Sequence, residues 1–299
     1  MFDISIGTLI PALDAAKMIP QLNPQGFECY ALDFNATDPS KIDFDALAAE
    51  ILPVLDGRTI SCLGYYKNPI LNEHDRENLA VLIRNAKKLS CRVVGAFAGG
   101  NPEKTIPDTI PQFRAAWEPL AAAAEDEGVR VGFEGCGGGW HGGSRNIGYC
   151  PDAWELMFDA VPSRALGLEW EPCHAIEGLA DPIMQLRHWA KRVVHIHGKD
   201  GTVAWDVIRE YGIHSPHPYC WNRTPGFGDT NWADVFTVLI QSGFVGSCDI
   251  EGYHDPVHYD DMEWTAQKTS LDYLKTCRGG ISYFEGPKEY RGYQGTRKK

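Results

Sequence analysis

Short apolar runs recur along the whole chain, and each is followed by a polar turn and a longer segment. Most of these runs are continuously apolar rather than alternating, which is typical of parallel strands that are covered on both faces. There are eight of them. The candidate strands are Ile4–Thr8, Phe27–Asp33, Thr59–Gly64, Arg92–Phe97, Val129–Glu134, Ala165–Glu171, Val193–His197 and Gly246–Glu251.

Several of the intervening segments carry apolar residues three and four positions apart, as one face of a helix requires. Gly128 and Gly243 follow two of these segments and are plausible caps, because glycine readily adopts the left-handed backbone that ends many helices. The candidate helices are Asp43–Leu55, Asp75–Leu89, Pro111–Glu127, Trp232–Ser242 and Glu263–Leu274.

Alternating strand and helix signals predict a parallel α/β fold. Eight strands within about 250 residues favour a closed (β/α)₈ TIM barrel. An open doubly wound sheet is the alternative, but its usual glycine-rich turn after the first strand is absent from residues 6–11. We expect a single barrel domain over residues 1–278. Residues 279–299 lose the apolar period and form either a disordered tail or an arm over a neighbouring subunit.

Two segments are long for connections between a strand and a helix, which usually take about 2–6 residues. Gly135–Tyr149 is rich in glycine and follows the fifth strand, and Gly198–Asp229 follows the seventh. Both are candidate lids or pocket walls, because loops at that end of a barrel build active sites.

Composition narrows the class of protein. The 299 residues are 43% hydrophobic and 23% charged, which fits a soluble globular chain, and the net charge of −12 disfavours binding to nucleic acid or to an anionic membrane. Nine cysteines with no C-x-x-C pair favour reduced thiols. With no signal peptide and no membrane-spanning run evident, we expect a cytoplasmic protein.

The candidate chemistry lies where four consecutive strands end. Their last residues are Glu134, Glu171, His197 and Glu251. A single glutamate at a strand end is usually solvated, but four such endings meet at one rim of a barrel and would repel one another. A divalent cation would resolve that repulsion. Mixed oxygen and nitrogen ligands suit Mn²⁺ best, with Mg²⁺, Co²⁺, Zn²⁺ and Fe²⁺ as alternatives.

Nearby residues leave some roles open. Glu169 faces the same side of its strand as Glu171 and competes for the ligand position. His195 lies one layer deeper than His197 and is expected to support it or to pack in the core. His174, three residues after Glu171, is then free to hold a substrate hydroxyl.

The glycine-rich loop Gly135–Tyr149 carries His141 and Trp140. One hypothesis is that His141 swings over the bound substrate as a base while Trp140 stacks on a sugar ring. The alternative, slightly favoured, is an exposed loop histidine without a catalytic role.

With these motifs, the chain resembles a known family, the xylose-isomerase-like TIM-barrel superfamily. Its members include sugar-phosphate isomerase/epimerase-like proteins, ketose 3-epimerases, inosose dehydratases and endonuclease-IV-type enzymes. The resemblance extends from Ile4 to Leu274. The segments that carry it are Gly132–Glu134, Glu171–His174, His195–Asp200, Pro225–Gly228 with Asn231 and Trp232, and Asp249–Gly252.

The resemblance implies roles for several residues. Glu134, Glu171, His197 and Glu251 match the family's metal ligands, His174 matches a substrate-binding histidine, and Arg223 lies where a substrate-binding arginine is often found. The usual Asp-Pro-Gly-His is Glu-Pro-Cys-His here, which leaves Glu169 in contention. DNA repair is disfavoured, because the chain is acidic and lacks extra histidines on its early strands.

The resemblance further implies a metal-dependent sugar isomerase or epimerase. Such an enzyme abstracts a proton next to a carbonyl through a metal-stabilised enediolate, with Glu134 and Glu251 as the acid/base pair. One alternative is a lyase on keto-sugars, similar to 3-keto-C-glycoside deglycosidases or inosose dehydratases, with His141 as base. A second is a non-catalytic sugar-binding barrel.

The expected partners are a sugar or keto-sugar and other copies of the chain in a homo-oligomer, with room for a small partner subunit if the lyase alternative holds. Nucleic acid and membrane are not expected as partners. No run of basic residues marks a phosphate pocket, although Arg145, Lys199 and Arg223 could supply one. Lys199 and Arg223 are also candidates for contacting the substrate. We therefore favour an unphosphorylated sugar.

Overall fold

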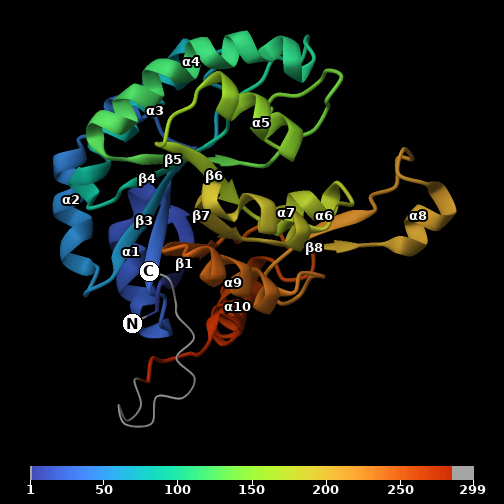
Figure 1. The fold of residues 1–299 in the computed structure, drawn as a ribbon. Helices are drawn as coiled ribbons and strands as arrows, with labels where there is room; N and C mark the ends of the chain where they lie inside the picture. Colours follow the sequence, from blue (N-terminus) through green and yellow to red (C-terminus); the bar gives the residue numbers. More distant parts are fainter. Residues whose placement is uncertain (1, 285–299) are drawn as a thin grey trace.

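The computed structural model of the protein describes residues 2–284. Eight parallel strands close into a barrel in the order β1-β10-β7-β6-β5-β4-β3-β2, with helices around the outside (Figure 1). The predicted TIM barrel is therefore confirmed, and the open sheet is not formed. The barrel strands are β1 (Ile4–Pro11), β2 (Cys29–Asp33), β3 (Thr59–Tyr65), β4 (Val93–Ala96), β5 (Arg130–Glu134), β6 (Leu166–Trp170), β7 (Val193–Gly198) and β10 (Gly246–Ile250).

The helices connect successive strands and cover the barrel. Those that the apolar spacing predicted are present, and the spacing missed several shorter ones, among them α1, which includes Pro20. The helices are α1 (Ala15–Leu22), α2 (Phe44–Ile51), α3 (Glu73–Asn85), α4 (Ile106–Glu127), α5 (Pro151–Ala160), α6 (Pro172–Glu177), α7 (Pro182–Trp189), α8 (Trp205–Tyr211), α9 (Trp232–Ser242) and α10 (Glu263–Arg278).

The helix α4 begins five residues before the predicted start at Pro111, at Ile106. The Thr105 hydroxyl accepts a hydrogen bond from the Asp108 backbone N–H at 3.2 Å, which caps the first turn. Gly128 ends the helix with a left-handed backbone (φ +60°), as its sequence position predicted.

The main apolar core lies between the strands and the helices. Trp117 on α4 is fully buried, and its ring meets Phe133 on β5 edge to face with centroids 4.6 Å apart. Trp232 at the start of α9 is likewise fully buried. This packing fixes the strands in place, so that residues at their carboxyl ends are held on a rigid frame.

The long segment after β7 is not an irregular loop. It contains an antiparallel pair, β8 (Asp200–Val203) and β9 (Cys220–Arg223), with α8 between the two strands. This hairpin extends away from the barrel on the side of α6 and α7 (Figure 1). Its base is anchored by Asp200, which accepts a hydrogen bond from the buried Trp232 indole at 3.0 Å.

The glycine-rich segment after β5 follows a different path from the one that a lid would need. The backbone N–H of Gly143 donates to the Pro102 carbonyl at 2.8 Å, and that of Ile106 donates to the Trp140 carbonyl at 3.1 Å. The tip of the loop is thereby held against the connection between β4 and α4.

No helix within residues 2–284 is long and apolar enough to cross a membrane. The last helix, α10, ends at Arg278, beside the boundary expected between barrel and tail. Most of the tail, residues 285–299, lies outside the described residues, so the two hypotheses for it stay predictions.

Candidate metal centre

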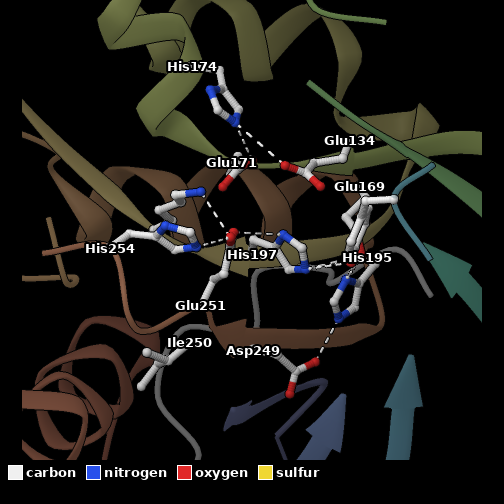
Figure 2. Close-up of polar contacts among 12 residues, drawn as sticks. Glu134, Glu169, Glu171, His174, His195, His197, Asp249, Ile250, Glu251 and His254 are labelled. Carbon is white, nitrogen blue, oxygen red and sulfur yellow. Dashed lines mark hydrogen bonds and ion pairs between the residues drawn. The ribbon is translucent and has the colours of Figure 1, made fainter. Parts of the chain in front are cut away.

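Four side chains converge at the carboxyl end of the barrel (Figure 2). Glu134 ends β5, Glu171 follows β6, His197 lies on β7 and Glu251 follows β10. One ligand atom from each lies within 4.8 Å of the others. The first three side chains are buried and Glu251 is largely buried. The residues that the strand ends singled out are thus brought together in space.

Several atoms of this group lack the partners that buried polar atoms normally have. Both carboxylate oxygens of Glu171, Nδ1 of His197 and Oε2 of Glu251 make no hydrogen bond. Oε1 of Glu171 lies 2.8 Å from His174 Nε2, and Nδ1 of His197 lies 3.2 Å from Oε2 of Glu251, in both cases without the alignment of a hydrogen bond. Because unpaired buried polar atoms are costly, their convergence indicates a missing common partner. Three carboxylates and one imidazole fit a divalent cation.

The ring of His197 is oriented for such a role. Its Nε2 atom lies 3.1 Å from the Tyr66 hydroxyl, and its Nδ1 atom faces Glu251. A metal-binding histidine normally uses one ring nitrogen for the ion and the other for a supporting hydrogen bond. Here the nitrogen on the side of the carboxylates is the free one.

Cationic side chains partly balance the carboxylates. The Lys199 ammonium is buried and donates to Glu251 Oε1 at 2.9 Å, and His254 Nε2 lies 2.8 Å from the same oxygen. His174 Nε2 lies 2.8 Å from Glu171 Oε1 and 3.6 Å from a Glu134 oxygen. These groups surround the four candidate ligands, so a substrate would contact them at the same time.

Burial and charge perturb the acidities in this group. Burial raises the pKa of Glu134 to about 7, and the neighbouring Glu171 and Glu251 carboxylates add to this rise. Burial also raises the pKa of Glu171, but His174 and Lys199 reverse that effect and hold it at about 2. Burial lowers the pKa of His197, yet Glu169 and Glu251 outweigh this and raise it to about 10. Proton affinities this far from normal are typical of functional sites.

The group opens into a cavity of about 460 Å³. Glu134, Lys199 and Glu251 line its polar side, and Tyr66 and Phe97 give it an aromatic wall. This size and mixture are usual for a small-molecule site. A larger hollow of about 540 Å³ lies between α1 and α10, but Lys268 is its only ionisable lining residue, so it offers little chemistry.

The structure distinguishes the two glutamates of the sixth strand. Glu171 belongs to the group of four, whereas Glu169 lies deeper, with Oε1 2.6 Å from His195 Nδ1. The geometry therefore favours Glu171 as the ligand and places His195 below the centre, as its position in the sequence predicted.

Two loop residues from the sequence analysis lie apart from the group. His141 is exposed at the loop tip and Trp140 packs partly against the core. Within residues 2–284, no described contact joins either side chain to the four candidate ligands. Arg223 is half-buried, and its Nε donates to Asp255 Oδ2 at 3.1 Å, so this part of the guanidinium holds the loop after β10.

Among the cavity residues that the sequence analysis missed, three carry polar groups next to the candidate centre. Asp33 ends β2 and lines the cavity, so the rule that found the four strand ends would have found it too. His254 follows Glu251 by three residues, which is the spacing that drew attention to His174 after Glu171. Tyr66, just beyond β3, carries no sequence signal for its contact with a histidine on β7.

Fold and site together define a (β/α)₈ barrel with a carboxylate–histidine centre at its carboxyl end. The family model described as "Xylose isomerase-like TIM barrel" matches residues 23–277. The chain therefore belongs to the xylose isomerase-like TIM-barrel family. No protein of curated function matches the chain by sequence.

Solved structures similar to this one include three enzymes of low sequence identity. An L-ribulose 3-epimerase is 16% identical with a TM-score of 0.68, covering 92% of this chain and 96% of its own. A 3-keto-D-glucoside 4-epimerase from E. coli is 12% identical with a TM-score of 0.68 (92% and 100%). A probable 3-DHS dehydratase from Bacillus anthracis is 12% identical with a TM-score of 0.66 (90% and 98%). At these identities the likeness is one of fold.

Proposed function

We propose that the protein is a divalent-metal-dependent sugar isomerase or epimerase that abstracts a proton next to a carbonyl. The observation that carries the proposal is the group Glu134, Glu171, His197 and Glu251, whose ligand atoms lie within 4.8 Å of one another beside a cavity that Glu134 and Glu251 line. The printed descriptions of two similar structures, an L-ribulose 3-epimerase and a 3-keto-D-glucoside 4-epimerase, support the substrate class.

The same four residues would hold the ion, for which Mn²⁺ is our first choice because three oxygens and one nitrogen suit it. When bound, the ion would supply Lewis-acid stabilisation of negative charge developing on a carbonyl oxygen.

Glu134 and Glu251 are the proposed acid/base pair. They come from β5 and from the end of β10, which are separated in the barrel by β6 and β7. A ring or chain lying between them would offer one face to each carboxylate, as removal and return of a proton on opposite faces require. Lys199, bonded to Glu251, stabilises the ionised form of that carboxylate.

His174 and Lys199 are the proposed substrate-binding groups. His174 Nε2 lies between oxygens of Glu134 and Glu171, where a substrate hydroxyl next to the reacting carbon would be within reach. Arg223 remains a candidate for the far end of a substrate only if its pairing with Asp255 leaves part of the guanidinium free.

The proposal is tested by incubating the Mn²⁺-loaded protein with a panel of ketoses and keto-glycosides in deuterated water. Deuterium should enter at the carbon beside the carbonyl. Glu134→Gln and Glu251→Gln should each abolish the exchange, whereas Glu118→Gln, a change at an exposed glutamate on the outer helix α4, should not. The absence of exchange on every substrate would contradict the isomerase proposal, and sugar binding without any turnover would favour the sugar-binding barrel.

A keto-sugar lyase is the second candidate. Two observations favour it: the similarity to a probable dehydratase, and His254, which pairs with Glu251 and is 46% exposed. Such a carboxylate–histidine pair can pass a proton to a departing oxygen. Release of water or of an aglycone in the same incubations, without deuterium exchange into recovered substrate, would identify the lyase.

The proposed setting is the cytoplasm, supported by nine cysteines that are all free. A homo-oligomer, and a small partner subunit for the lyase alternative, remain proposals that mass measurement of the native protein would test.

A further inference from the structure

A second layer of charged residues lies inside the barrel directly below the candidate metal centre. Glu169 on β6, His195 on β7 and Asp249 on β10 are all buried. Both nitrogens of His195 are engaged: Nδ1 lies 2.6 Å from Glu169 Oε1, and Nε2 lies 2.6 Å from Asp249 Oδ2. Figure 2 shows these side chains as a chain of contacts that leads from Asp249 up to His197.

This layer is unusual for its location. The interior of such a barrel is normally filled by branched apolar side chains, and a buried ionic group is seldom the most stable filling. Glycines make room for it. A Cβ atom on Gly95 would lie 2.5 Å from Glu169 Oε1, and one on Gly7 would lie 2.1 Å from Asp249 Oδ1. The barrel is therefore shaped around these carboxylates, which indicates a use for them beyond packing.

The layer meets the metal centre at His197, whose ring also packs edge to face on that of His195 with centroids 5.4 Å apart. Glu169 Oε1 lies 3.4 Å from His197 Nε2, the ring nitrogen that faces away from the candidate ion. The Tyr66 hydroxyl lies 3.1 Å from the same nitrogen. A hydroxyl both donates and accepts hydrogen bonds, so Tyr66 alone fits either ring tautomer. An ionised carboxylate only accepts, so Glu169 favours the tautomer with hydrogen on Nε2 and a free lone pair on Nδ1.

Further contacts hold Glu169 in that position. The Cys62 thiol lies 3.5 Å from Oε1, and the imidazole of His195 is fixed from its other side by Asp249. Asp249 in turn accepts from the Cys29 thiol at 3.3 Å. A displacement of Glu169 toward the cavity would break the contact with His195, so the chain of contacts restrains the carboxylate from below.

We propose that Glu169 is a positioning residue that presents Nδ1 of His197 to the metal ion, and that His195 and Asp249 act through Glu169. The inference rests on the proposed function, because it assigns a task to residues beneath the proposed metal site. The sequence left Glu169 as an alternative to Glu171 for the metal-ligand position, and the inference makes it a residue that orients His197 instead.

The test measures binding of Mn²⁺ alone by competition with a chelator in four proteins: wild type, Glu169→Gln, Asp249→Asn and Tyr66→Phe. Loss of a supporting partner typically costs about 10–100-fold in metal affinity. We expect a loss in this range for Glu169→Gln and a smaller one for Asp249→Asn, which lies one residue further along the chain of contacts. X-ray absorption of bound Mn²⁺ should show a weakened imidazole contribution in Glu169→Gln, which general loosening of the fold would not produce selectively.

Glu28→Gln is the matched control, because Glu28 is a partly buried carboxylate near the opposite end of the barrel. It should lower the thermal midpoint while leaving Mn²⁺ affinity unchanged. If Glu169→Gln bound Mn²⁺ as tightly as the wild type, or if only Tyr66→Phe weakened binding, the inference would be overturned while the proposed function stood. If the wild type bound no Mn²⁺, both would fall.

Discussion

Two clusters of buried charge lie at opposite ends of the barrel, and they are built differently. At the amino end, one carboxylate, Glu28, faces two cations: Arg278 Nη2 at 3.1 Å and Lys275 Nζ at 3.4 Å. Arg278 also donates to the Ile4 carbonyl at 2.7 Å, which ties the last helix to the first strand. At the carboxyl end, three carboxylates face the Lys199 ammonium and several imidazoles, and several buried atoms have no hydrogen bond.

The difference separates a structural cluster from one that awaits a ligand. A buried ion pair with satisfied partners contributes to holding the fold, and losing one member leaves an uncompensated charge. A surplus of carboxylates without partners opposes folding, and it persists where function requires it. Perturbing each end should therefore have opposite consequences for stability and for binding.

The largest effect is expected for Glu251→Gln on metal binding. The change removes a charged ligand and leaves Lys199 and His254 without their partner. We expect a loss of Mn²⁺ affinity of more than about 100-fold, since even an outer supporting residue typically contributes up to that much. Elemental mass spectrometry of the purified wild type and variant checks this. Equal metal content in the two proteins would contradict the centre as described.

The largest effect on the free energy of unfolding is expected for Arg278→Met, at the amino end of the barrel. Arg278→Met leaves Glu28 without its main partner and the Ile4 carbonyl without its donor. We expect the free energy of unfolding to fall by up to about 3 kcal/mol, the lower end of the range for breaking a buried pair, because Glu28 is partly exposed and keeps Lys275 as a partner. Urea unfolding measures it. Arg114→Met is the control, because its partner Glu118 is exposed and such pairs contribute about 0–1 kcal/mol.

Replacing an ionised carboxylate at the candidate metal centre should stabilise the metal-free protein, whereas Arg278→Met should destabilise it. The pKa of Glu134 is about 7 in the folded state, above its ordinary value of 4.5, so ionised Glu134 opposes folding. This opposition is absent below pH 4.5, grows as pH rises and is complete above pH 7. Glu134→Gln should therefore raise the metal-free free energy of unfolding at pH 8 by on the order of 1 kcal/mol.

The same variant should show no such gain well below pH 4.5, where the wild-type carboxyl is protonated in both the folded and the unfolded state. A gain of equal size at both pH values would mean that the cause is packing rather than charge. Chelator-treated protein is used throughout, because bound metal would reverse the sign of the effect.

Metal binding should release protons. Without metal, the pKa values of about 7 for Glu134 and about 10 for His197 mean that protons occupy two of the four ligands near neutral pH. Ligands must lose their protons to bind an ion. Calorimetric titration with Mn²⁺ in buffers of different ionisation enthalpy should detect release of about one to two protons at pH 6.5, and fewer at pH 8.5. No dependence on the buffer would count against this protonation state.

The smallest effect is expected for His141→Ala. The loop that carries His141 is held toward the connection between β4 and α4 by the bond from Gly143 to Pro102. An exposed residue away from the centre should change activity by less than about twofold. Turnover on the substrate found by deuterium exchange checks this. A loss of 100-fold or more would restore His141 as the base of the lyase alternative.

Much of the barrel could be predicted because burial on both faces leaves a local record in the sequence. Each of the eight runs became a strand with ends near those predicted, and Trp232–Ser242 is a helix with those bounds. The helix α1 was missed because Pro20 interrupts its pattern, although Pro20 is near its end. The hairpin β8–β9 was missed because its strands are short and half-exposed, with weak alternation.

The candidate ligands could be named from the sequence because parallel strands in a barrel bring their carboxyl ends to one rim. That geometric rule needs no knowledge of side-chain packing. The rule is weaker for residues outside the strands. Sequence reasoning proposed His141 and Trp140, but their loop turns toward the connection between β4 and α4. It also missed Tyr66, which contacts His197. Loop direction depends on hydrogen bonds between distant segments, which local patterns do not record.

The sequence by itself determined the barrel, its family and the four residues most suited to a metal ion. Strand burial and strand ends are local properties that the order of residues expresses directly. Only the tertiary structure decided between Glu169 and Glu171, oriented Nδ1 of His197 toward the carboxylates and revealed the charged layer beneath. Those outcomes depend on distances between residues more than 20 positions apart, such as the 2.6 Å between Glu169 Oε1 and His195 Nδ1. Distances of that kind are set by the packing of the closed barrel as a whole.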